Sequence, residues 1–116
     1  MIMHVNWAYL RKGWNTCKKA QEALAQYEMD IETVVDARKE RLDADAAWEI
    51  LGQATTILTA KGRKIQTWHP QKDEKAAILA DAIGRSGNLR APTLRVGNDI
   101  FIGFNADLFD THFASH

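Results

Sequence analysis

The sequence lacks several features that mark specialised classes of protein. Cys17 is the one cysteine among 116 residues, so no internal disulfide can form, and we expect a cytoplasmic protein in a reducing environment. No apolar run approaches the roughly 18 residues of a membrane span. The first residues, MIMHVNWAYLRKG, also lack the basic-then-apolar pattern of a signal peptide. We therefore expect neither a membrane-bound nor a secreted protein.

An excess of one charge is also missing. Fifteen Lys and Arg residues balance fifteen Asp and Glu residues, so no net field points to nucleic acid or an anionic membrane. The mixed run DARKERLDAD (36–45) is interpreted as a solvated segment that leads into a helix, not as a binding patch. Metal-ligand spacing is absent from the four histidines, which are His4, His69, His112 and His116. No phosphate-binding glycine loop is present either, and we expect no cofactor.

The residues that are present predict one domain spanning 1–116, with an ordinary 46% of hydrophobic residues. Alternation over 3–9 predicts a half-buried first strand, and the β-branched run 31–37 predicts a second. Between them, a helix capped by Asn15 or Thr16 is expected, with one apolar face made of Cys17, Ala20, Leu24 and Tyr27. This order fits a right-handed parallel βαβ unit.

The remainder of the chain predicts three more helices and a hairpin. Asp43, Asp73 and Asn105 are the expected N-caps, Gly52 is expected to end the first of these helices, and the second is expected to run to Gly84. Their inward-facing residues are predicted to be Ala44, Ala47, Trp48 and Leu51; Ala76, Leu79, Ala80 and Ile83; and Leu108, Phe109 and Phe113.

Two further segments are predicted to contain pairs of strands. Gly97-Asn98 predicts a hairpin between strands at 93–96 and 100–103, and segment 55–70 is either a small hairpin around Lys61-Gly62 or an extended loop. The order βαβ, helices, then ββα predicts an α/β fold with a mixed sheet, in the thioredoxin arrangement.

Three segments carry a resemblance to a known family. They are NTCKKAQEAL (15–24), LRAPTLRVG (89–97) and FIGFNADLF (101–109). In their order and spacing they resemble the arsenate reductase-like (ArsC and Spx) branch of the thioredoxin superfamily. The resemblance covers nearly the whole chain, with 55–72 the least similar part. It implies a thioredoxin-like fold and thiol-based redox chemistry.

In that family a nucleophilic cysteine precedes the first helix, often in a Cys-x-x-Cys motif. The resemblance puts Trp14 at the nucleophile's position and makes Cys17 the resolving thiol. The helical pattern agrees, because Cys17 shares a face with Ala20 and Leu24 and should point inward, while the helix N-terminus and nearby basic residues should lower its pKa. Some members of the family carry selenocysteine, encoded by UGA. Trp14 therefore either replaces a selenocysteine or is a true tryptophan in a member that has lost the chemistry.

Arg90-Ala91-Pro92 is the second implied site. The resemblance makes Pro92 cis, opposite the redox motif, and leaves the preceding backbone free to bind an extended partner. Arg90 matches an arginine that holds the oxyanion, although a solvated loop arginine is an equal alternative. Arg11 is a further substrate-binding candidate, because it should lie near the first helix. Arg63 and Arg95 are secondary candidates, and Arg95 is expected on the outer face of its strand.

Several functions are compatible with this pattern. The first is a thiol- or selenol-dependent oxidoreductase that uses a small thiol or a thioredoxin- or glutaredoxin-type protein as electron donor. The second is an inactive or regulatory Spx-like protein that binds a protein partner. The third is a one-cysteine, glutaredoxin-like protein in which Cys17 reacts with glutathione. A lone cysteine on an apolar helix face is otherwise an inert core residue. With Trp14 in place, we expect little or no reductase activity.

Overall fold

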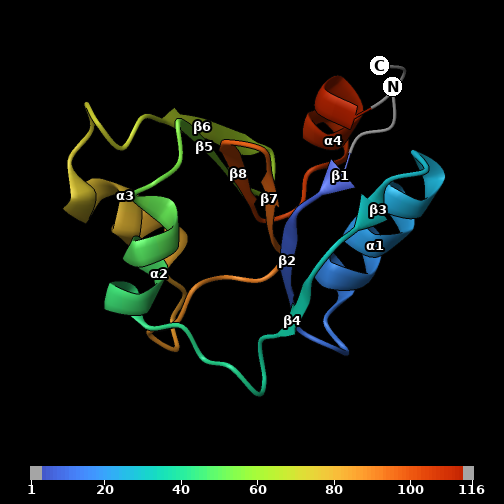
Figure 1. Cartoon of the computed structure of the whole chain (residues 1–116), viewed down its shortest axis with the longest axis horizontal. Coiled ribbons are helices and arrows are strands. Elements are labelled where there is room, and N and C mark those ends of the chain that lie inside the picture. Colours follow the sequence, from blue (N-terminus) through green and yellow to red (C-terminus); the bar gives the residue numbers. More distant parts are fainter. Residues whose placement is uncertain (1–3, 114–116) are drawn as a thin grey trace.

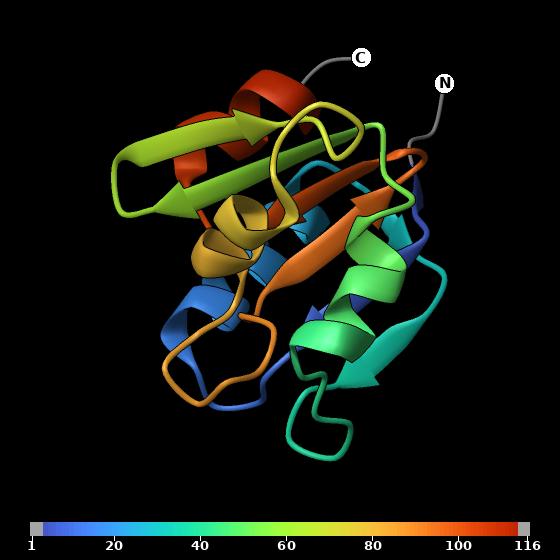
Figure 2. The same cartoon turned by 90° about the vertical axis from the view of Figure 1, so that its left-hand side faces the viewer.

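A computed structural model describes residues 4–113 and shows three layers. A six-stranded mixed sheet separates α1 and α4 on one face from α2 and α3 on the other (Figure 1). The turned view in Figure 2 shows the α2 and α3 face. The helices in this part of the chain are α1 (Asn15–Gln26), α2 (Ala44–Leu51), α3 (Lys75–Ala82) and α4 (Ala106–Phe113). The predicted α/β class with a mixed sheet is confirmed. Met3 and His116, named in the predictions, lie outside the described residues.

The sheet has the strand order β4-β2-β7-β8-β5-β6, and β1 and β3 form a separate parallel pair. The strands are β1 (His4–Val5), β2 (Trp7–Leu10), β3 (Asp30–Ile31), β4 (Val34–Asp36), β5 (Thr56–Lys61), β6 (Lys64–Trp68), β7 (Thr93–Val96) and β8 (Asp99–Ile102). The predicted parallel βαβ unit is present as β2-α1-β4. The predicted hairpin β7–β8 is antiparallel, and segment 55–70 forms the antiparallel hairpin β5–β6.

The first strand differs from its prediction. It divides at Asn6, and β2 is largely buried on both faces because helices cover both faces of the sheet. Ala8 and Leu10 belong to the core beneath α1 and α4, whereas Tyr9 belongs to the core beneath α2 and α3. The expectation of a half-buried strand therefore holds for His4 and Val5 but was wrong for the β2 part. The predicted strand 31–37 is likewise divided, into β3 and β4.

Two of the predicted N-caps are confirmed. The Asp43 carboxylate accepts a hydrogen bond from the Ala46 amide at 2.9 Å, and the Asn105 side chain accepts one from the Leu108 amide at 2.9 Å. Asp73 is not a cap: α3 begins after Glu74, and the Asp73 carboxylate instead accepts from the backbone amide of His69.

The N-terminus of α1 also differs from its prediction. Neither Asn15 nor Thr16 is the cap, because both are already helical. Trp14 occupies the N-cap position and makes no side-chain hydrogen bond there. The expected inner face of α1 is confirmed for Cys17, which is 2% exposed, and for Ala20 and Leu24, whereas Tyr27 is the C-cap and is only partly buried. The first turn of α1 therefore has no side-chain acceptor of its own.

Helix α3 turns a different face inward. It buries Ile78 and Ala82, whereas the predicted inward residues Ala76 and Ala80 are exposed. The segment KAAILADA is apolar on nearly every side, so its periodicity does not define one face. The inner faces predicted for α2 and α4 agree better with the structure, in which Leu51 and Phe109 are fully buried.

The sheet brings the ends of four strands to one edge. β2 and β4 are parallel, β7 is antiparallel to β2 and β8, and β5 is parallel to β8. The carboxyl ends of β2, β4 and β5 therefore lie beside the amino end of β7. A basic residue stands at or just beyond each of these ends: Arg11 after β2, Arg38 after β4, Lys61 at the end of β5 and Arg90 before β7.

Candidate functional site

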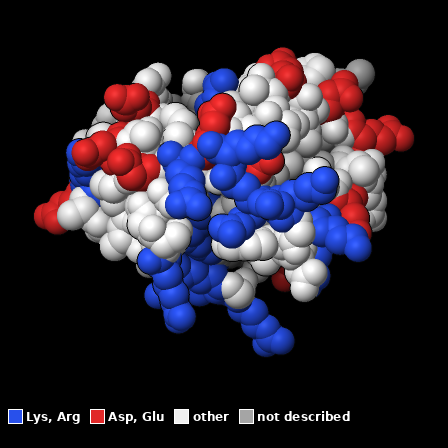
Figure 3. All heavy atoms as spheres, turned by 90° about the horizontal axis from the view of Figure 1, so that it is seen from below, with Lys and Arg blue, Asp and Glu red and all other residues white. Residues whose placement is uncertain are grey.

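A pocket of about 980 Å³ opens at this edge of the sheet. Six basic residues line it: Arg11, Arg38, Arg41, Lys61, Arg85 and Arg90. Of residues 4–113, no aspartate or glutamate lines the pocket. Figure 3 shows basic side chains gathered on the face that contains this edge. The pocket is thus strongly cationic in a chain of zero formal net charge.

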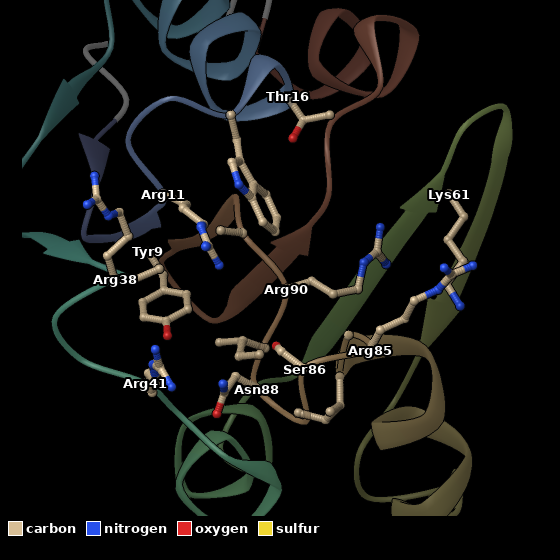
Figure 4. A pocket seen from close by; sticks show the side chains of 16 residues that line it. Tyr9, Arg11, Thr16, Arg38, Arg41, Lys61, Arg85, Ser86, Asn88 and Arg90 are labelled. Atoms are coloured by element: carbon tan, nitrogen blue, oxygen red, sulfur yellow. The ribbon is translucent and has the colours of Figure 1, made fainter.

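The basic side chains come from two opposite walls (Figure 4). Arg38 and Arg41 extend from the segment that joins β4 to α2, beside Tyr9. Lys61 and Arg85 extend from the end of β5 and from the segment after α3. Arg11 lies between these walls, below the first turn of α1.

Trp14 lies at the rim of the pocket. Its side chain is 46% exposed, and the Arg11 guanidinium carbon lies 4.4 Å from the centre of its ring. This cation–π contact holds the indole and the guanidinium together. Gly13 makes the preceding turn with φ +91°, a conformation that favours glycine. Thr16, in the first turn of α1, also lines the pocket.

Cys17 lies one turn into α1, behind the pocket. Its sulfur accepts a hydrogen bond from the Arg11 amide at 3.3 Å. Burial raises the pKa of the Cys17 thiol, and this outweighs the lowering effects of the Arg11 amide, the Thr16 side chain and the Arg11 charge. The prediction that the helix N-terminus and basic neighbours would lower this pKa was wrong, because desolvation dominates. The prediction that Cys17 faces inward is confirmed.

Arg90 is a partly buried group that ties the pocket to the sheet. Its Nη2 donates to the carbonyl of Ala60 at 2.7 Å, and its Nη1 donates to the carbonyl of Asp81 at 3.1 Å. Burial lowers the pKa of the Arg90 guanidinium, and the nearby Asp81 charge partly offsets this. The guanidinium remains charged, because its ordinary pKa is above 12. Arg90 is therefore not a solvated loop arginine.

A polar network lies next to Arg90. The buried Thr59 hydroxyl donates to the Asp81 carboxylate and accepts from Trp68 Nε1 at 3.1 Å. Lys61 Nζ lies 3.0 Å from the other oxygen of that carboxylate. Burial alone would raise the pKa of Asp81, but the hydrogen bond from Thr59 and the hydrogen bond and charge of Lys61 lower it, with a smaller lowering effect of Trp68. The network joins α3 to β5 and β6.

Tyr9 positions the opposite wall. Its hydroxyl donates to the carbonyl of Glu40 at 2.6 Å and accepts from the amide of Leu42 at 3.2 Å. These two bonds fix the backbone on either side of Arg41. The amide of Leu89 in turn donates to the carbonyl of Leu42 at 2.7 Å, which ties this wall to the segment before β7.

Of the predicted site residues, the structure brings Trp14, Arg11 and Arg90 together in one pocket. Pro92 is buried and its peptide bond with Ala91 is cis, as the resemblance implied. Cys17 does not line the pocket. The secondary candidates Arg63 and Arg95 are exposed and do not line the pocket.

Sequence reasoning missed the rest of the cationic lining. Arg38 and Arg41 belong to the run 36–45; both are exposed, as predicted for a solvated segment, but they also line the pocket, which the interpretation of this run did not foresee. Lys61 and Arg85 carried no local signal for a pocket, because Lys61 was assigned to a turn and Arg85 to a loop. The useful signal was shared position, since Arg11, Arg38 and Lys61 each stand at or just beyond the carboxyl end of a strand.

No known protein family, curated protein or solved structure matches this chain. Among residues 4–113, no group of three or more histidine, cysteine or acidic side chains could hold a metal ion. No helix in the same range is long and apolar enough to cross a bilayer. The fold and the pocket therefore define an α/β protein with a cationic pocket at one sheet edge.

Proposed function

We propose that this pocket is a reductase-type site for an oxidised anionic substrate, on a thioredoxin-like fold of the arsenate reductase-like family. Residue 14 occupies the nucleophile's position and Cys17 is the resolving thiol. The observation that carries the proposal is the convergence of residue 14, Arg11 and Arg90 on one pocket at the N-terminus of α1. The neighbouring strands β4-β2-β7-β8 and the cis bond before Pro92 support the fold assignment.

The chemistry needs a thiolate or selenolate at residue 14. That group attacks the oxidised atom of the substrate and forms a covalent bond to it, while an oxygen or sulfur ligand of that atom leaves with the electron pair of its broken bond and takes up a proton from water. The Cys17 thiol then gives up its proton to water and attacks residue 14, forming an S–S or S–Se bond. The reduced substrate leaves with the electron pair of the broken bond. A small thiol or a thioredoxin- or glutaredoxin-type protein of the cytoplasm restores the dithiol or selenol–thiol pair.

With Trp14, the protein binds an anion without reducing it. An indole has no comparable nucleophilicity, and burial keeps the Cys17 thiol protonated by raising its pKa. The raised pKa and 2% exposure of Cys17 also disfavour a one-cysteine mechanism with glutathione. The codon for residue 14 separates two histories: UGA supports a selenoenzyme, and UGG supports a member that has lost the chemistry.

A regulatory role is the second candidate for the tryptophan form. The exposed Trp14 indole stands at the rim beside Arg11, and aromatic and arginine side chains are enriched in protein interfaces. A protein partner with an acidic surface would match the charge of this pocket. Such a protein could bind its partner but could not switch through an internal disulfide.

The Trp14→Cys variant tests the proposed function. We expect mild oxidation to remove both of its thiols, because residue 14 lies one helical turn before Cys17. The measurement is titration of free thiols together with the intact mass, which should fall by two hydrogen atoms as the oxidant takes up two electrons. Trp14→Ser is the matched control: it opens the same position without a second thiol and should keep one free thiol.

Two results would contradict the proposed roles of residues 14 and 17. If the parent protein reduces a disulfide or arsenate and Cys17→Ser abolishes this activity, Cys17 is the nucleophile and the proposed roles are wrong. If Trp14→Cys keeps both thiols after oxidation while its fold is unchanged, the two positions are not a redox pair.

A further inference from the structure

The cationic pocket is larger than an inorganic oxyanion requires. From its size, its two walls and its floor we infer that it binds an organic bis-anion, with one anionic group near Arg11 and a second held by Arg38 and Arg41. This inference rests on the proposed function only in placing the first group beside residue 14. The second group would be recognised whether or not residue 14 reacts.

The width of the sheet edge is the first argument. Arg38 follows β4 and Lys61 ends β5, and four strand spacings separate these strands in the sheet. At about 4.8 Å for each spacing, the two strands lie roughly 19 Å apart. A guanidinium–oxyanion hydrogen bond spans about 2.7–2.9 Å. The backbone positions that carry the basic side chains are thus spread well beyond the size of one tetrahedral anion, and two anionic groups on one molecule would use more of these side chains than a single group.

The floor of the pocket is the second argument. The apolar part of the lining, which we call the floor, includes Ala37, Ile83, Leu89 and Ala91. These side chains offer no hydrogen bond to an anion, but they can contact a carbon framework. Inorganic polyphosphate would leave this surface without a matching partner. An organic body that joins two anionic groups makes use of both the walls and the floor.

The wall formed by Arg38 and Arg41 is held in place by the fold. The Tyr9 hydroxyl bonds to the backbone on both sides of Arg41, and the Arg38 amide donates to the Asp36 carboxylate at 2.9 Å. Across the pocket, Asn88 forms an isolated β-bridge with Asp43. The backbone that carries these arginines is thus anchored before a ligand arrives, which lowers the entropy that binding would otherwise lose.

A concave site with an apolar floor favours a small molecule over an extended acidic protein segment. Phosphate and carboxylate are the groups that a guanidinium recognises in a bidentate manner. The ligand class is therefore an organic molecule with two separated phosphate or carboxylate groups.

The test compares fructose 1,6-bisphosphate with fructose 6-phosphate and inorganic phosphate by calorimetry at low salt, where exposed charges are least screened. We expect the bisphosphate to bind about ten- to a hundredfold more tightly than the monophosphate, as one added charged hydrogen-bond group predicts. Arg41→Gln should remove most of this advantage and change monophosphate affinity little. Arg63→Gln is the matched control, because it removes one positive charge outside the pocket.

Several outcomes would overturn the inference. These are equal affinities for the bisphosphate and the monophosphate, an equal loss in the Arg41 and Arg63 variants, or tighter binding of a hexaglutamate peptide than of the bisphosphate. The last result would assign the pocket to an acidic protein segment. Thiol oxidation in Trp14→Cys is measured separately, so the redox proposal can fail while bis-anion binding holds, and the reverse.

Discussion

At the scale of single residues, Asp81 has more connections than its position on α3 would indicate. Its carboxylate meets Thr59 and Lys61, and its backbone carbonyl accepts from Arg90. The carboxylate therefore links α3 to β5, while the backbone carbonyl of the same residue holds Arg90 of the pocket. Changes to the carboxylate test the first role without removing the second.

Thr59→Val should destabilise the protein. Valine fills the same space, but it leaves Trp68 Nε1 and one Asp81 oxygen without their partner in a buried region. Losing a buried hydrogen-bond partner costs about 1–3 kcal/mol. The measurement is the free energy of unfolding in urea, beside the control Thr67→Val on the exposed face of β6. Equal stabilities of the two variants would contradict the role assigned to this network.

Asp81 should also contribute to the pH dependence of stability. Its folded-state pKa lies below the ordinary value of 3.8, so its ionised form stabilises the fold above that value. This contribution is lost as the pH falls through the lower folded-state pKa. Asp81→Asn should be less stable near neutral pH and should lose less further stability on acidification. Urea unfolding at several pH values measures this, and parallel curves for parent and variant would refute it.

At the scale of elements, the end of β8 is packed tightly against the end of β5. Gly103 has φ +88°, and a Cβ there would lie 2.4 Å from the carbonyl oxygen of Ala60 and 3.0 Å from Arg90 Nη2. The Gly103 amide also donates to the carbonyl of Pro92 at 2.8 Å. Only glycine fits between these backbone and side-chain atoms, so this position couples two strands to the pocket arginine.

Gly103→Ala should therefore cost more stability than Gly13→Ala. Both positions have a positive φ, which costs a non-glycine residue roughly 1–2 kcal/mol. At Gly13 an added Cβ meets nothing within 4 Å, whereas at Gly103 it meets backbone. Thermal unfolding of the two variants is the measurement, and the difference between their losses of stability gives the cost of the steric clash at Gly103. If both lose the same stability, β5 has moved aside at little cost.

The elements also show what the sequence could and could not predict. Local patterns were sufficient for the inward side of α1, the cap at Asp43 and the β7–β8 hairpin, because each depends on neighbours within a few residues. The prediction of the inward face of α3 was wrong because this segment is apolar on nearly every side. The presence of Arg38 and Lys61 in one pocket was not predicted, because it depends on the pairing of β5 with β8. Pairing between strands far apart in the sequence cannot be inferred from a local pattern.

At the scale of the whole molecule, the predicted class, the parallel βαβ unit and the cis bond before Pro92 are confirmed. The redox role is a different kind of prediction, since it depends on the chemistry of one side chain. Trp14 occupies a position with suitable surroundings but without a nucleophile. A fold can therefore be inferred from many weak signals, whereas an activity here depends on one residue.

The one-sided lining of the pocket has an electrical consequence. Formal charges sum to zero over the chain, so the basic residues gathered at one sheet edge are balanced by acidic residues elsewhere. The separation of the two signs gives the molecule a dipole moment whose positive end is the mouth of the pocket. An approaching anion is drawn to that end and turns the protein toward itself, and dissolved salt weakens this torque. A neutral protein thus acquires a preferred direction of encounter.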